Sequence, residues 1–481
     1  MITARRMAAV DRNAAALGVS QRQLMEASGR AVADAVRDLA GPDGPVAIVA
    51  GRGNNGGDAF VTARVLDADV AVHLLGRPTT IATEAARANW DALTAAEADV
   101  RVVRDSRDLD LGEPDVVVDA ILGTGITGVP REPEASAIEA VNAAGAAGAT
   151  VVSVDVPSGL DADTGEAAGP VVDSDRVVTF HDLKPGLADR DAVVVADIGI
   201  PAAAERFTGP GDLLGLDRPS ESHKGDFGHV LVVGGGPYTG APALAALAAL
   251  RAGGDLATVA TPEAAAPAVQ SFGPDLIVRS LAGEQLEPAH VDDVLALADE
   301  RDALLLGPGL GDAAATREAV AGVLAGYDGR AVVDADALQV VPEVDTDATL
   351  VCTPHQGELR AMGGPRDDDW RERADAVGAY AADLGHTLLV KGAYDVISDG
   401  ATTRINRTGN PGMTVGGTGD VLAGATGALL CRLEPVDAAA VGAFANGTAG
   451  DRVAASQGAG GLLASDLLDE LPGALREATY D

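Results

Sequence analysis

The sequence has few cysteines and aromatic residues and no long apolar run. Among 481 residues there are two cysteines, Cys352 and Cys431, and aromatic residues make up 3%. Both cysteines stand in apolar surroundings, which predicts buried free thiols and excludes a disulfide framework. The sequence contains no uninterrupted run of about 18 apolar residues, the length that a transmembrane helix needs. The first residues also lack the apolar core of a signal peptide. We therefore expect a cytoplasmic protein.

Positive charge is also scarce. The chain has 35 lysine and arginine residues against 72 acidic residues, a net charge of -37. This balance excludes a basic surface for nucleic acid or an anionic membrane, so any phosphate site must be a local exception. An acidic, lysine-poor chain is typical of halophiles, whose salt-rich cytoplasm screens repulsion between surface charges. An acidic protein from a GC-rich genome is the alternative.

The distribution of apolar runs predicts two α/β domains. Between about residues 45 and 200, and again from residue 223, short apolar runs that do not alternate with polar residues are followed by glycine-bearing turns and amphipathic stretches. Such runs predict parallel strands buried on both faces. Two helices are expected before the first sheet, an antiparallel hairpin at Asp399-Gly400, and mostly helix after residue 411. The predicted domains are 1–205 and 223–481, joined by a linker at 206–222.

The stretch GNPGMTVGGTGDVLAG, at 409–424, places a glycine-rich turn and Asp420 directly before an apolar helical run. Unpaired N–H groups at the positive end of such a helix form an anion site. It is not a Walker loop, because no Lys-Ser or Lys-Thr follows the glycines. A carboxylate here suits a base that takes the proton of a hydroxyl attacking a phosphoryl group held by the loop. Asp420 is therefore a candidate catalytic base.

This stretch resembles the anion-hole motif of the ribokinase-like superfamily. With HKGDFGHVLVVGGGPYTG, LGPGLG, DADAL, TPHQGE and VKGAYDVI, in order between about 220 and 470, it is similar to the C-terminal half of the bifunctional NAD(P)H-hydrate repair enzymes. The resemblance implies a ribokinase-like α/β/α domain and a nucleotide-dependent dehydratase. That enzyme phosphorylates the hydroxyl of the S epimer of hydrated NADH or NADPH and then eliminates phosphate. ADP, giving AMP, is the expected co-substrate, with ATP as the alternative and Mg²⁺ as the expected ion.

The resemblance also implies residue roles. Asp420 would contact the substrate hydroxyl, and Ala241, Gly309 and His355 would contact the hydrated dinucleotide. The nucleotide would be bound by Lys391, Gly392, Ala393, Tyr394, Asp395 and Gly419.

Several of these motifs have other interpretations. VVGGGPYTG could be a Rossmann fingerprint, although no acidic residue ends a following strand at the expected distance. His355 could be a structural histidine, but its position at a strand end favours ligand binding. The aspartates of DADAL, Asp334 and Asp336, could be a catalytic pair or strand-end caps and stay unassigned.

The first domain has its own glycine-rich stretch, VAGRGNNGGDAF at 49–60. A strand, a turn and a helix follow one another here; backbone N–H groups can hold a pyrophosphate, and asparagine oxygens can bind a cation. The stretch resembles the NAD(P)H-hydrate epimerase domain, as do LMEASGRAVA, DAILGTGITG and SVDVPSGLDADTG. The match covers about residues 1–205 and implies a Rossmann-like α/β/α sandwich that interconverts the R and S hydrates.

Carried over by position, Asn55, Asp119 and Ser158 would bind K⁺, which suits hard oxygen ligands. Asp155, at the carboxyl end of a buried strand, is the candidate acid–base residue, with a turn cap as the alternative. The substrate would be held by Asn54, Asn55, Gly56, Gly57, Asp58, Gly123, Thr124, Gly125, Ile126, Thr127, Gly128, Val129 and Asp155.

Two residues depart from the family pattern. Ala59 and Ala27 stand where a third glycine and an asparagine are usual. The first could tighten the loop slightly, and neither removes a candidate ligand. Lysine occurs only at Lys184, Lys224 and Lys391, all in family-like motifs; a compact ammonium near phosphate or in a packed turn would explain this, and chance is the alternative.

We expect a fused epimerase and nucleotide-dependent dehydratase that acts on small molecules as a homo-oligomer. One alternative is a ribokinase-like small-molecule kinase for a vitamin precursor or sugar, with a dinucleotide-binding N-terminal domain. Another is a binding protein whose first domain senses the dinucleotide without catalysis. The epimerase-like half argues against a plain kinase, and the presence of both Asp155 and Asp420 argues against a pure binder.

Overall fold

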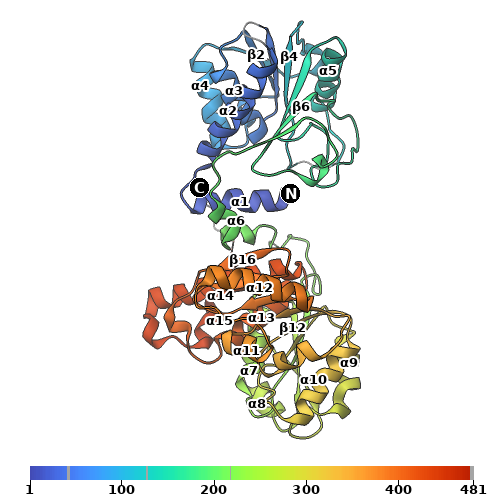
Figure 1. Ribbon diagram of the computed structural model, residues 1–481, viewed down its shortest axis with the longest axis vertical. Coiled ribbons are helices and arrows are strands. Elements are labelled where there is room, and N and C mark those ends of the chain that lie inside the picture. Colours follow the sequence, from blue (N-terminus) through green and yellow to red (C-terminus); the bar gives the residue numbers. More distant parts are fainter. Residues whose placement is uncertain (41–43, 126–127, 217, 477–481) are drawn as a thin grey trace. The chain divides into compact units, whose positions relative to one another are not determined.

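A computed structural model describes residues 1–40, 44–125, 128–216 and 218–476 of the chain (Figure 1). The chain divides into two compact units, Met1–Ala204 and Glu205–Asp481. Each unit contains one of the two tryptophans of the sequence, Trp90 or Trp370. The tryptophan fluorescence of a Trp90→Phe variant therefore reports on the second unit alone.

The first unit is built on a parallel sheet with the strand order β3-β2-β1-β4-β5-β6-β7. Every residue of β1 and β4 is buried, which is why their sequences do not alternate. Strand order reverses between β1 and β4, so the loops after these two strands open a crevice at the carboxyl edge. The strands are β1 (Val46–Ala50), β2 (Val70–Leu75), β3 (Asp99–Val103), β4 (Val116–Ala120), β5 (Thr150–Val154), β6 (Arg176–Phe180) and β7 (Val193–Ala196).

Helices cover both faces of this sheet. Ile48 packs in one core cluster with Phe60 of α3 and Trp90 of α4, whereas Val49 packs in another with Ile138 of α5. The two helices predicted for the first forty residues are present (Figure 1). The helices are α1 (Ala4–Ala16), α2 (Gln21–Ala40), α3 (Asn54–Val65), α4 (Glu84–Ala95), α5 (Glu134–Ala146), α6 (Ala202–Arg206) and the 3₁₀ helices η1 (Pro78–Thr80), η2 (Ser106–Asp108) and η3 (Pro185–Leu187).

The second unit has a nine-stranded sheet in the order β10-β9-β8-β11-β12-β13-β14-β15-β16. Its strands are parallel up to β14, and β15 and β16 form the predicted antiparallel hairpin. Gly400 takes the left-handed φ of +90° that this turn needs. The strands are β8 (His229–Val233), β9 (Leu256–Pro262), β10 (Ile277–Leu281), β11 (Ala303–Leu306), β12 (Arg330–Val333), β13 (Thr349–Cys352), β14 (Thr387–Val390), β15 (Asp395–Ser398) and β16 (Thr403–Asn406).

Alternate residues of these strands face two helical layers. Val230 packs against α7, α13 and α14, and its neighbour Leu231 packs on the side of α9, α10 and α12. The chain after residue 411 is mostly helical, as predicted. The helices are α7 (Gly240–Arg251), α8 (Ala266–Ser271), α9 (Val291–Ala298), α10 (Ala314–Gly326), α11 (Gln356–Ala361), α12 (Trp370–Leu384), α13 (Thr418–Leu430), α14 (Pro435–Gln457), α15 (Ala464–Ala474) and the 3₁₀ helices η4 (Pro210–Leu213), η5 (Pro288–His290), η6 (Ala335–Glu343), η7 (Pro411–Met413) and η8 (Ala459–Gly461).

Part of the predicted linker at 206–222 packs against the second unit. The Thr208 N–H donates to the Ile405 carbonyl at 2.9 Å, and Asp212 forms a buried ion pair with Arg404 at 2.7 Å. A loss of sequence periodicity predicts irregular backbone, but it carries no information about such tertiary contacts. The two cysteines are free, Cys352 buried and Cys431 partly buried. No helix in the described ranges is long and apolar enough to cross a membrane.

Close packing of α7 against α13 sets the position of the glycine-rich turn. A Cβ at Gly424 would lie 2.0 Å from the Ala245 carbonyl oxygen, so only glycine allows this approach. A Cβ at Gly427, one turn later, would meet only the Val230 Cγ1 at 3.5 Å, an ordinary contact.

We expect Gly424→Ala to lower the free energy of unfolding of the second unit by about 1–3 kcal/mol, because the helices must move apart. Gly427→Ala is the matched control and should change stability by about 0.5–1 kcal/mol in the opposite direction, through helix propensity. Urea unfolding followed by Trp370 fluorescence in a Trp90→Phe background measures both. Equal effects of the two substitutions would contradict the packing argument.

Candidate active sites

The second unit holds a glycine-rich turn at the start of α13. Gly417, at the N-cap, has a φ of +99°, and the helix begins at Thr418. The Thr418 hydroxyl donates to the Met413 carbonyl at 2.9 Å and ties the turn to η7. The N–H groups of the first helical turn are therefore presented together, as the sequence predicts, and Asp420 lies in that turn.

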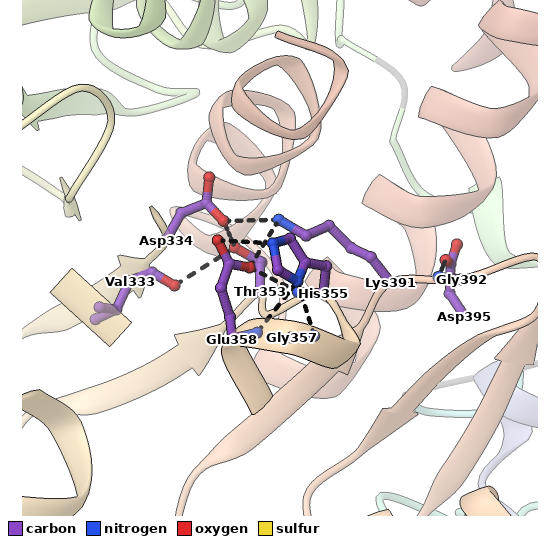
Figure 2. Close-up of polar contacts among 9 residues, drawn as sticks. All are labelled: Val333, Asp334, Thr353, His355, Gly357, Glu358, Lys391, Gly392 and Asp395. Carbon is purple, nitrogen blue, oxygen red and sulfur yellow. Dashed lines mark hydrogen bonds and ion pairs between the residues drawn. The ribbon is translucent and has the colours of Figure 1, made fainter. Parts of the chain in front are cut away.

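A buried carboxylate holds a lysine beside this turn (Figure 2). Lys391 follows β14, and its Nζ lies 3.0 Å from Asp334 Oδ1, after β12, and 3.7 Å from Glu358 Oε2. The Thr353 hydroxyl, after β13, donates to the same Asp334 oxygen at 2.7 Å. Neighbouring parallel strands thus bring these groups to one edge of the sheet. Asp334, which the sequence left unassigned, anchors Lys391.

The ammonium of Lys391 reaches α13. A Cβ at Gly419 would lie 3.3 Å from Lys391 Nζ. Burial lowers the pKa of Lys391, but the carboxylates of Asp334 and Glu358 outweigh burial and the pKa is raised, so Lys391 stays charged. Burial, followed by the Asp334 charge, raises the pKa of Asp420 to about 7, against a smaller opposite effect of Lys391. A carboxyl group with this pKa suits proton transfer near neutral pH.

His355 caps α11. The His355 Nδ1 accepts the backbone N–H groups of Gly357 at 2.9 Å and Glu358 at 3.1 Å, and the backbone N–H of His355 donates to Glu358 Oε2 at 2.7 Å. These capping hydrogen bonds support the alternative interpretation, in which His355 is a structural histidine. Because Nδ1 accepts, the neutral ring carries its hydrogen on Nε2, and the side chain is exposed. Contact of His355 with a substrate stays a prediction.

The other predicted residues of this unit fall into two groups. Ala241, in the first turn of α7, and Gly309, after β11, meet where the strand order reverses: a Cβ at Gly309 would lie 3.3 Å from the Ala241 Cβ. Gly392, Ala393, Tyr394 and Asp395 form the loop after β14, in which the Gly392 N–H donates to Asp395 Oδ1 at 2.8 Å.

Sequence reasoning missed Trp370, on α12. Its ring stacks on Tyr394 at a centroid distance of 5.2 Å and an interplanar angle of 16°. Nothing in the local sequence of α12 indicates this contact, because the two aromatic residues come from different elements of the fold.

In the first unit, the three predicted K⁺ ligands meet around Leu122. The Asn55 amide donates to the Leu122 carbonyl at 2.9 Å, and the Leu122 N–H donates to the Ser158 hydroxyl at 2.9 Å. Ser158 Oγ lies 2.5 Å from Asp119 Oδ1, and Asp119 is fully buried. The turn after β1 is shorter than the sequence predicts, because α3 already begins at Asn54 and includes the residues NNGGD. Ala59 is buried within that helix and does not lie in the loop.

Most residues of the predicted substrate set lie at this crevice. The side-chain oxygen Oδ1 of Asn54 accepts a hydrogen bond from the Thr83 hydroxyl at 2.8 Å, and a Cβ at Gly56 would clash with the Gly51 carbonyl. Gly123 and Gly128 line a cavity of about 240 Å³. Thr124, Gly125 and Val129 belong to the same segment, with Val129 exposed, whereas Ile126 and Thr127 lie outside the described residues.

Asp155 takes a left-handed backbone conformation with a φ of +64°, a strain of about 1–3 kcal/mol for a residue with a Cβ. Its Oδ1 lies 2.9 Å from the Nζ of Lys184, which is completely buried. Lys224, in contrast, is exposed. Of the three lysines, two therefore pair with carboxylates at the candidate sites.

Two further carboxyl groups face Asp155. Burial, and next the Asp155 charge, raise the pKa of Asp11 to about 6 and that of Asp58 well above its ordinary value. Sequence reasoning missed Asp11, on α1. The helical spacing could have found it, because Asp11 is four residues after Met7 and three before Ala14, both on the buried face.

Comparisons with known proteins cover both units. The family model of the NAD(P)H-hydrate dehydratase matches residues 230–473, and that of the YjeF-related protein N-terminus matches residues 21–186. The bifunctional NAD(P)H-hydrate repair enzyme Nnr of Methanothermobacter thermautotrophicus is 44% identical over 98% of this chain and 95% of its own length. The enzyme of the same name from Pyrobaculum aerophilum is 44% identical over 100% and 99%.

A solved structure supports the fold of the second unit. The ADP/ATP-dependent NAD(P)H-hydrate dehydratase from Bacillus subtilis, co-crystallised with ATP and Mg²⁺, is 29% identical with a TM-score of 0.50. The alignment covers 56% of this chain and 97% of that chain. The second unit therefore has the predicted ribokinase-like fold.

The raised pKa of Asp420 predicts a pH-dependent stability. Between about pH 4, the ordinary carboxyl value, and pH 7, the folded state holds a proton that the unfolded chain has lost. Stability contributed by this group therefore falls as the pH rises through that window. Asp420→Asn cannot ionise, so we expect the variant to gain stability relative to the parent between pH 5 and pH 8.

Thermal unfolding of the second unit, followed by Trp370 fluorescence at both pH values, measures this gain. Asp336→Asn is the control for replacing an aspartate at the same edge of the sheet, where Asp336 Oδ2 accepts only the Gly311 N–H in the described structure. A difference between Asp420→Asn and the parent that does not change with pH would contradict the assignment.

Proposed function

Because the chain belongs to the family of the bifunctional NAD(P)H-hydrate repair enzymes, we propose that its two units divide the repair chemistry between Asp155 and Asp420. The protein epimerises the R and S hydrates of NADH and NADPH and dehydrates the S hydrate at the expense of a nucleotide. Similarity over the full chain to enzymes with both activities disfavours a plain kinase and a pure binder. The observation that carries the residue assignment is an ion-paired lysine at each candidate site, the buried Lys184 on Asp155 and the partly buried Lys391 on Asp334.

In the second unit, Asp420 takes the proton of the substrate hydroxyl as its oxygen attacks the terminal phosphoryl group of the nucleotide. The bond from oxygen to phosphorus forms, the bond to the nucleotide oxygen breaks, and ADP becomes AMP. Phosphate then leaves with the electrons of its bond to carbon, helped by the ring nitrogen, and the neighbouring carbon loses a proton to restore the double bond. A phosphate ester makes this elimination far easier than loss of hydroxide would be.

The charge on the transferred phosphoryl group is stabilised by the N–H groups at the start of α13 and by Lys391. The distance of Lys391 Nζ from Gly419 supports this position at the phosphoryl end of the nucleotide. Gly392, Ala393, Tyr394, Asp395 and Gly419 complete the nucleotide site, and Ala241, Gly309 and His355 hold the hydrated dinucleotide. We propose ADP rather than ATP as the donor, with Mg²⁺ carried on the nucleotide phosphates.

In the first unit, epimerisation inverts the ring carbon that bears both the hydroxyl group and nitrogen. The hydroxyl leaves as water after taking a proton, the nitrogen lone pair stabilises the resulting cation, and water returns on the other face. Asp58, whose pKa burial raises well above its ordinary value, supplies the first proton, and Asp155 takes the proton of the entering water. Exchange with solvent then restores both groups, so no co-reactant is consumed.

K⁺ fits the oxygen-rich group of Asn55, Asp119 and Ser158. These residues and the Leu122 carbonyl offer hard oxygen ligands with a single carboxylate, which suits a monovalent cation better than a divalent one. A bound K⁺ would supply positive charge near the substrate phosphates and compensate the buried Asp119. We further propose cytoplasmic action on these soluble cofactors and a homo-oligomeric state, which light scattering would test.

Recovery of NADH absorbance near 340 nm from purified R and S hydrates, with ADP or ATP and Mg²⁺ in KCl, tests the assignment. We expect the parent protein to convert both epimers and Asp155→Asn to convert only the S epimer. Asp420→Asn should convert neither, each loss being about 10²–10⁴-fold. Folded parent protein that recovers no NADH with either nucleotide would contradict the repair activity and favour a kinase.

Removal of K⁺ tests the cation site. Replacing KCl by NaCl at constant ionic strength should slow epimerisation of the R hydrate, and Ser158→Ala should weaken this dependence. Dehydration of the S hydrate by the same sample is the internal control and should not change. If epimerisation runs at the same rate in both salts, K⁺ has no role in the first unit.

A further inference from the structure

Lys184, which has no assigned role, uses all of its hydrogen-bond donors inside the protein. It lies after β6, and none of its surface is exposed. Its Nζ donates to the Phe180 carbonyl at 2.7 Å and to the Asp182 carbonyl at 3.4 Å, and it lies 2.9 Å from Asp155 Oδ1. An ammonium has three donors, so none is left for a substrate.

Within the described residues, all the polar contacts of the Asp155 carboxylate fall on one oxygen. Besides Lys184, Oδ1 accepts the Thr179 hydroxyl at 3.1 Å and the Phe180 N–H at 3.4 Å. No donor in the described part of the chain reaches Oδ2, and the side chain is 15% exposed. One oxygen is therefore anchored, and the other is available to a ligand.

The surroundings keep the ammonium in place. Thr179 is buried, and the Ile2 N–H donates to the Leu183 carbonyl at 2.9 Å, which holds the segment that carries Lys184 against the start of the chain. The ionisable groups that face Asp155 are Lys184, Asp11 on α1 and Asp58 on α3. Lys184 thus brings a positive charge to a group of three carboxyl groups, those of Asp155, Asp11 and Asp58.

We propose that Lys184 is the positioning residue of the first unit: it holds Asp155 by Oδ1, in the left-handed backbone conformation, so that Oδ2 exchanges the proton with the substrate. The inference rests on the proposed epimerisation. It also explains a lysine at this position, because the larger, planar guanidinium of arginine does not fit an enclosed site of this shape.

Lys184→Met tests the proposal, since it removes the charge and keeps the length of the side chain. Epimerisation of the R hydrate, followed without nucleotide by chromatography of the two epimers, should fall on the order of 10²-fold. The acid limb of its pH profile should move to higher pH, because the carboxylate loses its cation. Lys184→Arg should not restore the rate, and dehydration of the S hydrate should stay within about twofold of the parent.

The outcomes distinguish failure of the proposed epimerisation from failure of the positioning role of Lys184. Parent protein that does not epimerise the R hydrate contradicts the proposed function itself. An active parent with a folded Lys184→Met variant that keeps the rate, or loses rate without a shift of the acid limb, contradicts the positioning role. If Lys184→Met fails to fold, Thr179→Val decides: it removes a weaker donor from the same oxygen, and an unchanged rate would overturn the proposal.

Discussion

Both candidate sites depend on a buried or partly buried ammonium held by a carboxylate. An unpaired charge inside a protein is so costly that removing one partner of a buried pair typically destabilises the fold by about 3–5 kcal/mol. Lys184 and Asp155 in the first unit, and Lys391 and Asp334 in the second, therefore fix the loops that carry them. In the second unit the lysine faces the proposed base Asp420, and in the first it contacts the proposed base directly.

The sheets explain why these pairs form where they do. In both units the strand order reverses beside a central strand, and parallel strands end at the same edge. Residues from distant parts of the sequence, such as Asp334 and Lys391, follow neighbouring strands and so come within hydrogen-bonding distance. The glycine-rich starts of α3 and α13 add N–H groups at the same edges, which offsets locally the strong negative charge of the chain.

The sequence was sufficient to predict features that depend on local pattern. Buried parallel strands appear as apolar runs without alternation, and the hairpin turn appears as Asp399-Gly400. It was insufficient where tertiary contacts decide. The packing of Thr208 and Asp212 on β16, the stacking of Trp370 on Tyr394 and the anchoring of Lys391 by Asp334 join residues whose separation in the chain is large.

The sequence also could not predict roles that depend on the orientation of individual side-chain atoms. The capping bonds of His355 and the choice of Oδ1 over Oδ2 in Asp155 follow from side-chain orientation. Asp11 is an intermediate case, since its helical spacing could have placed it on the buried face of α1 but does not indicate its neighbours.

With three lysines in the chain, ¹⁵N-lysine labelling gives one ammonium signal for each, and NMR of these signals tests the central role of the paired lysines. Lys184 and Lys391 should give signals protected from solvent exchange, each assigned by its loss in the methionine variant, while the exposed Lys224 should exchange fast. ADP should shift the Lys391 signal and leave that of Lys184 unchanged. Three signals that exchange alike would contradict the ion pairs on which both sites depend.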